Sequence, residues 1–267
     1  MPELGPNFEA RKNVTKKKII SALEDLKSVD RDAIFNRNVP NFGGFGERRE
    51  WWERYPVPEW IRFLAEEVGG HILGAGGERA VIDLGNGKLL GIYRENKDLN
   101  AKDLKALFHT FKVLHILFPQ HFPHMYAAGI SSSLPKNLQF LGKLFRKVFP
   151  EHVVLFDIKE KVVSSDNSND NLQKFEAGKG GYNDQINIAV QALSRLGIKL
   201  SIDHAPENVL GDMYIDSRAR MTGLDDRPLT GEHLEKLIWY MREHNYSDNE
   251  ISDVEKPFKR LFDLGKK

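Results

Sequence analysis

The chain has 267 residues, with 39 Lys and Arg against 38 Asp and Glu, which leaves a net charge of +1. This balance argues against a dedicated nucleic-acid binder, because phosphate contacts draw on an excess of basic side chains. The sequence has no cysteine, so disulfides, thiol nucleophiles and thiolate metal ligands are excluded. Without a signal-like start or a long apolar run, we expect a cytoplasmic protein that does not enter a membrane.

Residues 1–66 are predicted to form an extension in front of the main body of the protein. Residues 16–26 space their apolar side chains as a helix does, and residues 37–46 are rich in glycine, which is typical of a loop. Trp51, Trp52 and Trp60 follow closely. We expect these tryptophans to anchor the extension, because aromatic side chains contribute large buried areas. The alternative is that they stack against a base or a sugar.

Residues 67–158 are predicted to form a first lobe built on an antiparallel sheet. Asn86-Gly87 is typical of a hairpin turn and leads into an expected strand over residues 88–94. A helix is expected over residues 103–118, where apolar side chains recur at helical spacing. The other expected strands lie within residues 69–84 (two strands around a glycine-rich turn), 125–131 and 153–158.

Residues 159–267 are predicted to form a second, mainly helical lobe. The segment 164–183 is rich in Ser, Asn, Asp and Gly and is expected to be a flexible insert. Helices are expected over residues 184–196, 233–244 and 249–264. Strands in the first part and helices in the second predict an α+β protein with two lobes of different class.

Asp203 and Asn208 are the best candidates for catalytic chemistry. They stand at the two ends of the segment Asp-His-Ala-Pro-Glu-Asn. A carboxylate can accept or orient the proton of an attacking hydroxyl, and a carboxamide oxygen is a hard ligand for Mg²⁺. The spacing of the two is that of a kinase catalytic loop. The alternative is an ordinary loop, because Pro206 fixes φ and Asp and Asn side chains bond to nearby backbone.

The glycines Gly74, Gly76 and Gly77 lie between two expected strands. Because glycine has no side chain, backbone N–H groups in such a loop can approach phosphate oxygens closely. A dinucleotide fingerprint is excluded, since no helix follows the glycines. The order of glycine hairpin, helix, apolar strand and long helix before Asp203 supports a phosphate-binding role.

Residues 69–226 resemble the protein-kinase-like superfamily, and their second half looks more like aminoglycoside phosphotransferases than eukaryotic protein kinases. The resemblance implies a two-lobed protein-kinase-like fold, with an antiparallel-sheet N-lobe, a mainly helical C-lobe and a helical extension in front, and ATP and Mg²⁺ as cofactors. It implies these roles: Gly74, Gly76 and Gly77 at the phosphates, Val81 against the adenine, Arg94 bridging phosphates, Asp157 and Lys159 in the hinge whose backbone bonds the adenine, Asp203 at the acceptor proton, and Asn208 at Mg²⁺.

In this family a second metal carboxylate follows a strand, and the sequence offers two places for it. Asp216 follows the more apolar segment but requires a very tight hairpin that turns at residues 211–212. Asp225 or Asp226 allows a longer hairpin that turns at residues 216–219, and either one follows Thr-Gly and an apolar residue, which resembles the family pattern. We favour Asp225 and Asp226.

Several features of the family are missing from the sequence, among them the lysine of one strand and the acidic residue that pairs with it. The strand over residues 88–94 offers Gly91, Tyr93 or Arg94 where a lysine is usual, and no acidic residue stands between residues 104 and 118 to pair with it. We predict an ATP- and Mg²⁺-dependent phosphotransferase that acts on a hydroxyl acceptor, either a small molecule or a protein. The alternative is a catalytically impaired pseudokinase that binds a nucleotide or serves as a scaffold.

Overall fold

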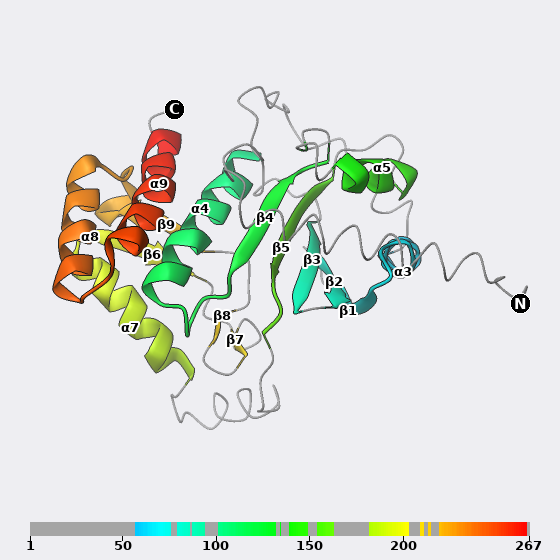
Figure 1. The fold of residues 1–267 in the computed structure, drawn as a ribbon, viewed down its shortest axis with the longest axis horizontal. Helices are drawn as coiled ribbons and strands as arrows, with labels where there is room; N and C mark the ends of the chain where they lie inside the picture. Colours follow the sequence, from blue (N-terminus) through cyan, green and yellow to red (C-terminus); the bar gives the residue numbers. More distant parts are fainter. Residues whose placement is uncertain are drawn as a thin grey trace, which may run out of the picture. The chain divides into compact units, whose positions relative to one another are not determined.

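The computed structural model describes residues 57–75, 79–85, 87–93, 101–131, 134, 139–148, 154–162, 182–202, 209–210, 213–214 and 219–265 (Figure 1). Most of the predicted extension, including Trp51 and Trp52, lies outside these residues, and so does the predicted insert except for its last two residues. The described residues group into two compact units.

The two units divide the chain differently from the predicted lobes. The first unit contains the described residues up to 105 together with 125–161, and the second contains 106–124 together with those from 162 onward. The boundary after Lys161 lies close to the predicted one after Ile158. The segment 106–124, predicted in the first lobe, belongs to the second unit.

The first unit is built on a five-stranded antiparallel sheet, which confirms the predicted antiparallel sheet. The strands are β1 (His71–Ala75), β2 (Arg79–Gly85), β3 (Lys88–Tyr93), β4 (Met125–Ile130) and β5 (Leu155–Glu160), and their order in the sheet is β1-β2-β3-β5-β4. The turn from β2 to β3 contains Gly87 at φ +69°, a left-handed conformation that glycine adopts without steric cost.

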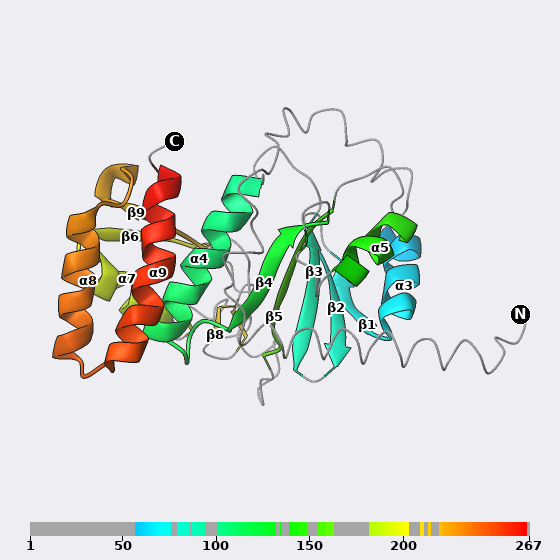
Figure 2. The same ribbon diagram turned by 45° about the horizontal axis from the view of Figure 1, so that its top comes forward.

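Two helices, α3 (Val57–Val68) and α5 (Gln139–Val148), pack against each other beside this sheet (Figure 2). The ring of Phe145 on α5 lies 5.4 Å from that of Phe156 on β5. The sheet face that carries Phe156 is apolar and buried, and its members include Ile82, Leu90, Ile92 and Ile158. Each such side chain contributes about 1.5–3 kcal/mol of burial free energy. Helix α5 is absent from the sequence-based prediction.

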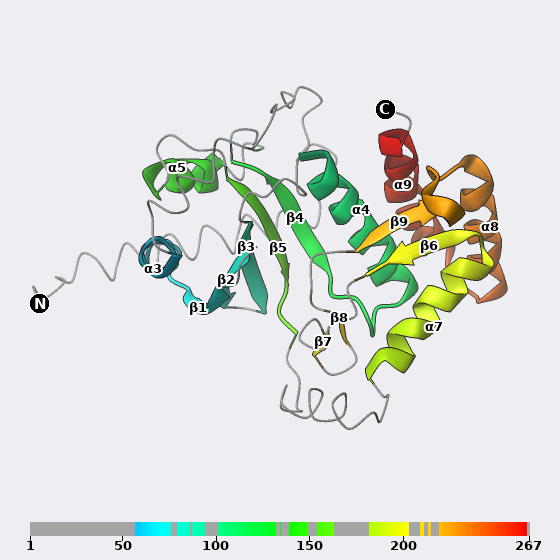
Figure 3. The same ribbon diagram turned by 180° about the vertical axis from the view of Figure 1, so that it is seen from behind.

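The second unit combines helices with two short antiparallel strand pairs (Figure 3). Strand β6 pairs with β9, β7 pairs with β8, and α7 contacts β6. Helix α4 (Ala101–Leu117) belongs to this unit from residue 106 onward. The other elements are α7 (Tyr182–Arg195), β6 (Ile198–Ser201), β7 (Val209–Leu210), β8 (Met213–Tyr214), β9 (Arg220–Gly223), the 3-10 turn η5 (Leu224–Asp226), α8 (Gly231–Glu243) and α9 (Asp248–Gly265). Helices α7, α8 and α9 confirm the predicted helical segments.

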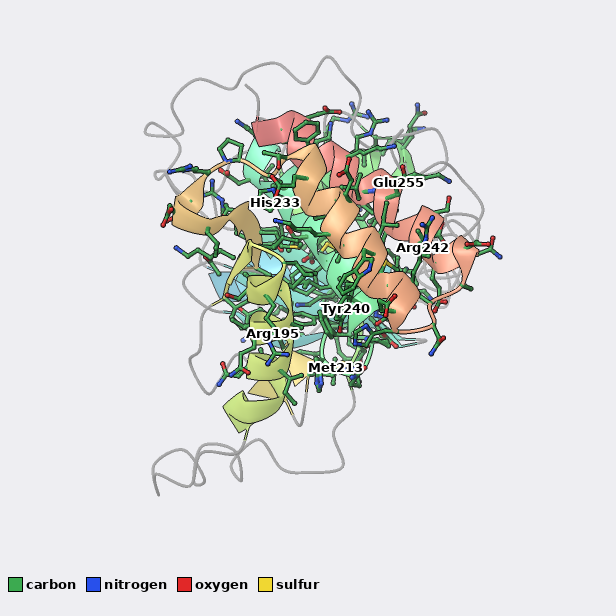
Figure 4. The ribbon with its side chains drawn as sticks, turned by 90° about the vertical axis from the view of Figure 1, so that its left-hand side faces the viewer. Arg195, Met213, His233, Tyr240, Arg242 and Glu255 are labelled. Carbon is green, nitrogen blue, oxygen red and sulfur yellow. The ribbon has the colours of Figure 1, made fainter. Side chains whose placement is uncertain are left out.

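Helices α8 and α9 lie side by side, with Tyr240 and Arg242 on α8 and Glu255 on α9 labelled in Figure 4. Tyr246, in the turn between the two helices, donates a hydrogen bond of 2.7 Å to the carbonyl oxygen of Leu117 at the end of α4. Burial raises the pKa of the Tyr246 hydroxyl above 10.0, and Tyr240 and Glu250 add to the shift.

None of the described helices combines the length and the apolar character that a membrane-spanning helix needs.

Candidate functional site

Strands β7 and β8 form a very tight hairpin in the second unit. Val209 pairs with Tyr214 and Leu210 pairs with Met213, so that only residues 211–212 connect the strands. The chain therefore enters and leaves this hairpin at the same end. A turn at residues 211–212 is the one that Asp216 requires. The longer hairpin with a turn at residues 216–219, which favoured Asp225 and Asp226, was a wrong prediction.

Asp225 and Asp226 follow the far end of the β6–β9 pair. Ser201 pairs with Arg220 and Ile198 pairs with Gly223, so the end of β9 lies beside the start of β6. Residue 203 follows the other end of β6, and the strand between these ends spans about 10 Å. The β6–β9 register therefore does not bring Asp225 and Asp226 to the end of β6 from which the chain continues to residue 203.

Both carboxylates are exposed in the turn η5 and have left-handed backbone, with φ of 60° at Asp225 and 59° at Asp226. The Nζ atom of Lys199 donates to both carboxylate oxygens of Asp226, at 2.9 and 3.0 Å. Among the described residues, no three His, Asp or Glu side chains gather closely enough to hold a metal ion. Asp203, Asn208, Asp216, Gly76, Gly77 and Arg94 lie outside the described residues.

In the first unit, Arg79, Tyr93 and Asp157 form a buried polar cluster on the sheet. The Tyr93 hydroxyl donates to Asp157 Oδ2 at 2.6 Å, and Arg79 Nη2 forms an ion pair with Asp157 Oδ1. The Arg79 guanidinium carbon lies 5.3 Å from the centre of the Tyr93 ring. The Asp157 side chain is completely buried, and that of Arg79 is 13% exposed.

Strand register explains why the three side chains share one face. Arg79 of β2 is the cross-strand partner of Tyr93 on β3, and Gly91 on β3 is the partner of both Asp157 on β5 and Val81 on β2. Because side chains alternate along a strand, these residues face away from the apolar side that carries Phe156. The five-stranded sheet therefore has one apolar face and one face with buried charges.

Gly91 makes room for the polar cluster. A Cβ atom at this position would overlap Nε and Nη2 of Arg79 and Oδ1 of Asp157. The guanidinium of Arg79 therefore crosses β3 over the glycine and reaches Asp157 on the next strand. The sequence offers no local signal for this contact, because Arg79 and Asp157 are 78 residues apart.

Asp157 and Lys159 do not form a hinge. Both lie within β5, where Asp157 is paired with Gly91 and Ala128, and Lys159 with Leu89 and Met125. Strands therefore flank β5 on both edges, and the sheet occupies the backbone groups that a hinge would offer to an adenine. The predicted strand ended at residue 158, whereas β5 continues to Glu160. The hinge assignment of Asp157 and Lys159 is wrong for this reason.

Asp83 anchors the chain where it leaves β5. Its carboxylate accepts hydrogen bonds from Lys161 Nζ at 2.6 Å and from the Gly85 amide at 2.7 Å, and His71 Nε2 lies at 3.3 Å. Burial by itself raises the pKa of Asp83. The hydrogen bonds from Lys161 and Gly85 and the charges of Lys161 and His71 outweigh this effect, so the pKa lies below the ordinary 3.8. The Lys161 amide also donates to the Gly87 carbonyl at 2.7 Å.

Replacing Asp83 by asparagine should lower the free energy of unfolding at pH 7 by about 1–2 kcal/mol, because charged hydrogen bonds are lost. A carboxylate with a lowered pKa stabilises the fold above its ordinary pKa and loses this effect as the pH falls through the folded value. The difference between wild type and Asp83→Asn should therefore narrow below about pH 3.8. Urea unfolding from pH 7 to pH 3 measures this.

The matched control is Glu235→Gln, which changes an exposed carboxylate on α8. Its free energy of unfolding should differ little from that of wild type over the same pH range, because exposed charges contribute little. An Asp83→Asn difference that stays constant from pH 7 to pH 3 would show that the carboxylate charge is not the cause.

No protein-family model, curated protein or solved structure matches this chain. The functional assignment therefore rests on the sequence motifs and on the two geometries described above, the tight β7–β8 hairpin and the polar face of the five-stranded sheet.

Proposed function

We propose that the protein is an ATP- and Mg²⁺-dependent phosphotransferase with a two-lobed protein-kinase-like fold, which transfers the γ-phosphoryl group to a hydroxyl acceptor, either a small molecule or a protein. The tight β7–β8 hairpin is the observation that carries this proposal. It supports Asp216, in place of Asp225 or Asp226, as the second metal carboxylate.

The hairpin supports this assignment through chain connectivity. Asn208 precedes Val209 by one residue, and Asp216 follows Tyr214 by two residues. Val209 and Tyr214 are cross-strand partners. Adjacent Cα atoms are about 3.8 Å apart and antiparallel partners about 5 Å apart. The short connections from this pair to Asn208 and to Asp216 support the proposal that the two residues share one ion.

The donor set fits magnesium. Mg²⁺ prefers hard oxygen ligands, and the Asn208 amide and the Asp216 carboxylate supply such oxygens. When bound, the ion neutralises charge on the phosphates. Asp203 orients the acceptor hydroxyl and takes up its proton, so that the oxygen can attack the γ-phosphorus while ADP leaves. In the first unit, the glycines at 74, 76 and 77 would cover the phosphates, and Val81 would contact the adenine.

A thermal-shift measurement with ATP, with and without Mg²⁺, tests the proposal. A ligand that binds only the folded state stabilises it by about 2.7 kcal/mol at 100 times its Kd, so ATP with Mg²⁺ should raise the unfolding midpoint. Asp216→Asn should remove the Mg²⁺-dependent part of the shift. Asp225→Asn is the matched control and should keep it.

Two outcomes would contradict the proposal. If ATP leaves the wild-type midpoint unchanged with and without Mg²⁺, the protein does not bind this nucleotide. If Asp225→Asn loses the Mg²⁺-dependent shift and Asp216→Asn keeps it, the metal site includes the turn η5. The assignment of Asp216 as the second metal carboxylate is then wrong.

A second candidate function is that of a catalytically impaired pseudokinase. The observation that favours it is the composition of β3, because Gly91 and Tyr93 face the polar side of the sheet and neither is a cation. For this candidate we expect ATP to shift the midpoint without dependence on Mg²⁺, or not at all, and no phosphate release from ATP.

A further inference from the structure

The polar face of the sheet contains a cation above β3, although β3 itself does not supply it. The guanidinium of Arg79 extends from β2 across Gly91 to Asp157 on β5. It occupies the space that a side chain at position 91 would fill. The cation therefore lies directly over the strand on which the kinase resemblance leads us to expect a lysine.

We infer that Arg79 and Asp157 replace the missing lysine–glutamate pair, with Arg79 as the contact to the nucleotide phosphates and Asp157 as the residue that positions it. This inference rests on the proposed function. It moves the cation from β3 to β2 and the carboxylate from helix α4 to β5. It also accounts for a strand β3 that has no lysine after Lys88, and for a helix α4 whose one carboxylate, Asp103, lies in the first turn.

The geometry of the ion pair suits a shared guanidinium. Asp157 Oδ2 accepts the Tyr93 hydroxyl, so Arg79 is held through Oδ1. The guanidinium has five donors in a planar fork, and this arrangement can serve a carboxylate and a phosphate oxygen together.

Tyr93 holds the other two residues in place. Its hydroxyl orients the Asp157 carboxylate, and its ring lies 5.3 Å from the Arg79 guanidinium carbon. A cation near an aromatic ring is attracted to the negative face of the ring. Tyr93 is thus a positioning residue at the point of β3 where the sequence lacks a lysine.

Stability alone explains the ion pair poorly. Removing two charges from water costs roughly as much as their attraction returns, and apolar side chains of similar volume often stabilise a protein as well or better. On the opposite face of the same sheet, the buried side chains are apolar and include Ile82, Leu90 and Phe156. A need for a cation at this point accounts for the buried ion pair on the polar face, where apolar side chains would otherwise be expected.

Calorimetric binding of ATP and of adenosine to the full chain tests the inference, because only ATP carries phosphates. Arg79→Met should weaken ATP binding by about 10- to 100-fold, the loss of one charged hydrogen-bonding contact. Its affinity for adenosine should stay within about twofold of wild type, because Arg79 contacts the phosphates and not the base. Arg79→Lys should retain part of the ATP affinity, since it keeps the charge but loses the fork.

A rescue variant separates phosphate binding from folding. A Cβ atom at position 91 would overlap the side chains of both Arg79 and Asp157. In the triple variant Arg79→Ala, Asp157→Ala and Gly91→Lys, both side chains are shortened and a lysine projects from β3 itself. This variant should regain ATP affinity over the double variant Arg79→Ala with Asp157→Ala. Urea unfolding of each variant confirms that the fold is retained at the temperature of the binding measurement.

The outcomes distinguish failure of the inference from failure of the proposed function. If the wild type binds ATP and Arg79→Met binds it equally well, the inference is overturned and the proposed function stands. If Arg79→Met loses ATP and adenosine to the same degree, the cluster shapes the sheet without contacting phosphates, and the inference is again overturned. If the wild type binds neither ligand, the proposed function fails first.

Discussion

Replacing Asp203 by alanine should lower the rate of γ-phosphoryl transfer by about 10²- to 10⁴-fold, the range that a positioned general base contributes. ATP affinity should change little, because in the proposed mechanism this carboxylate acts on the acceptor hydroxyl and not on the nucleotide. Release of phosphate from ATP in the presence of Mg²⁺ measures transfer to water, and incorporation of labelled phosphate into the protein measures transfer to its own hydroxyls.

The matched control is Asp225→Ala, an exposed carboxylate of the same unit beyond the far end of the β6–β9 pair. It should retain wild-type turnover. Turnover of Asp203→Ala equal to that of wild type would refute the role of Asp203. A wild type that binds ATP and releases no phosphate would favour the pseudokinase.

Replacing Asp157 by alanine should lower the free energy of unfolding by about 3–5 kcal/mol, because it leaves the Arg79 charge without its carboxylate in a buried site. The Asp157 side chain is completely buried and accepts from both Arg79 and Tyr93. Urea unfolding at pH 7, followed by circular dichroism, measures the loss.

Two further variants identify the cause of this loss. Tyr93→Phe removes one hydrogen bond and should cost about 0.5–1.5 kcal/mol, plus some desolvation of the Asp157 oxygen left behind. The double variant Arg79→Met with Asp157→Val removes both charges and should be more stable than Asp157→Ala. An Asp157→Ala loss below about 1 kcal/mol would mean that water reaches the guanidinium and that the site is not buried in solution.

Local patterns were sufficient to predict the five strands of the sheet in the first unit and most helices of the described chain, but not the tight β7–β8 hairpin. The Asn86-Gly87 turn signal predicted the β2–β3 hairpin, and helical spacing predicted α7, α8 and α9. Helix α5 was missed although its signal is present, since Phe140, Leu141, Leu144 and Phe145 recur at helical spacing. The catalytic assignments to Asp203 and Asn208 stay predictions, because these residues lie outside the described part of the chain.

The sequence by itself determined which residue types are available for chemistry: a carboxylate and an amide at catalytic-loop spacing, glycines between two strands, and no lysine after residue 88 on β3. Only the tertiary structure decided where β5 ends, how tightly β7 and β8 turn, and that Arg79 reaches Asp157 over Gly91. The physical reason is that periodicity and turn chemistry act between near neighbours in the chain. Which residues share a sheet face, and which backbone groups are left for a ligand, depends on the register between strands far apart in sequence.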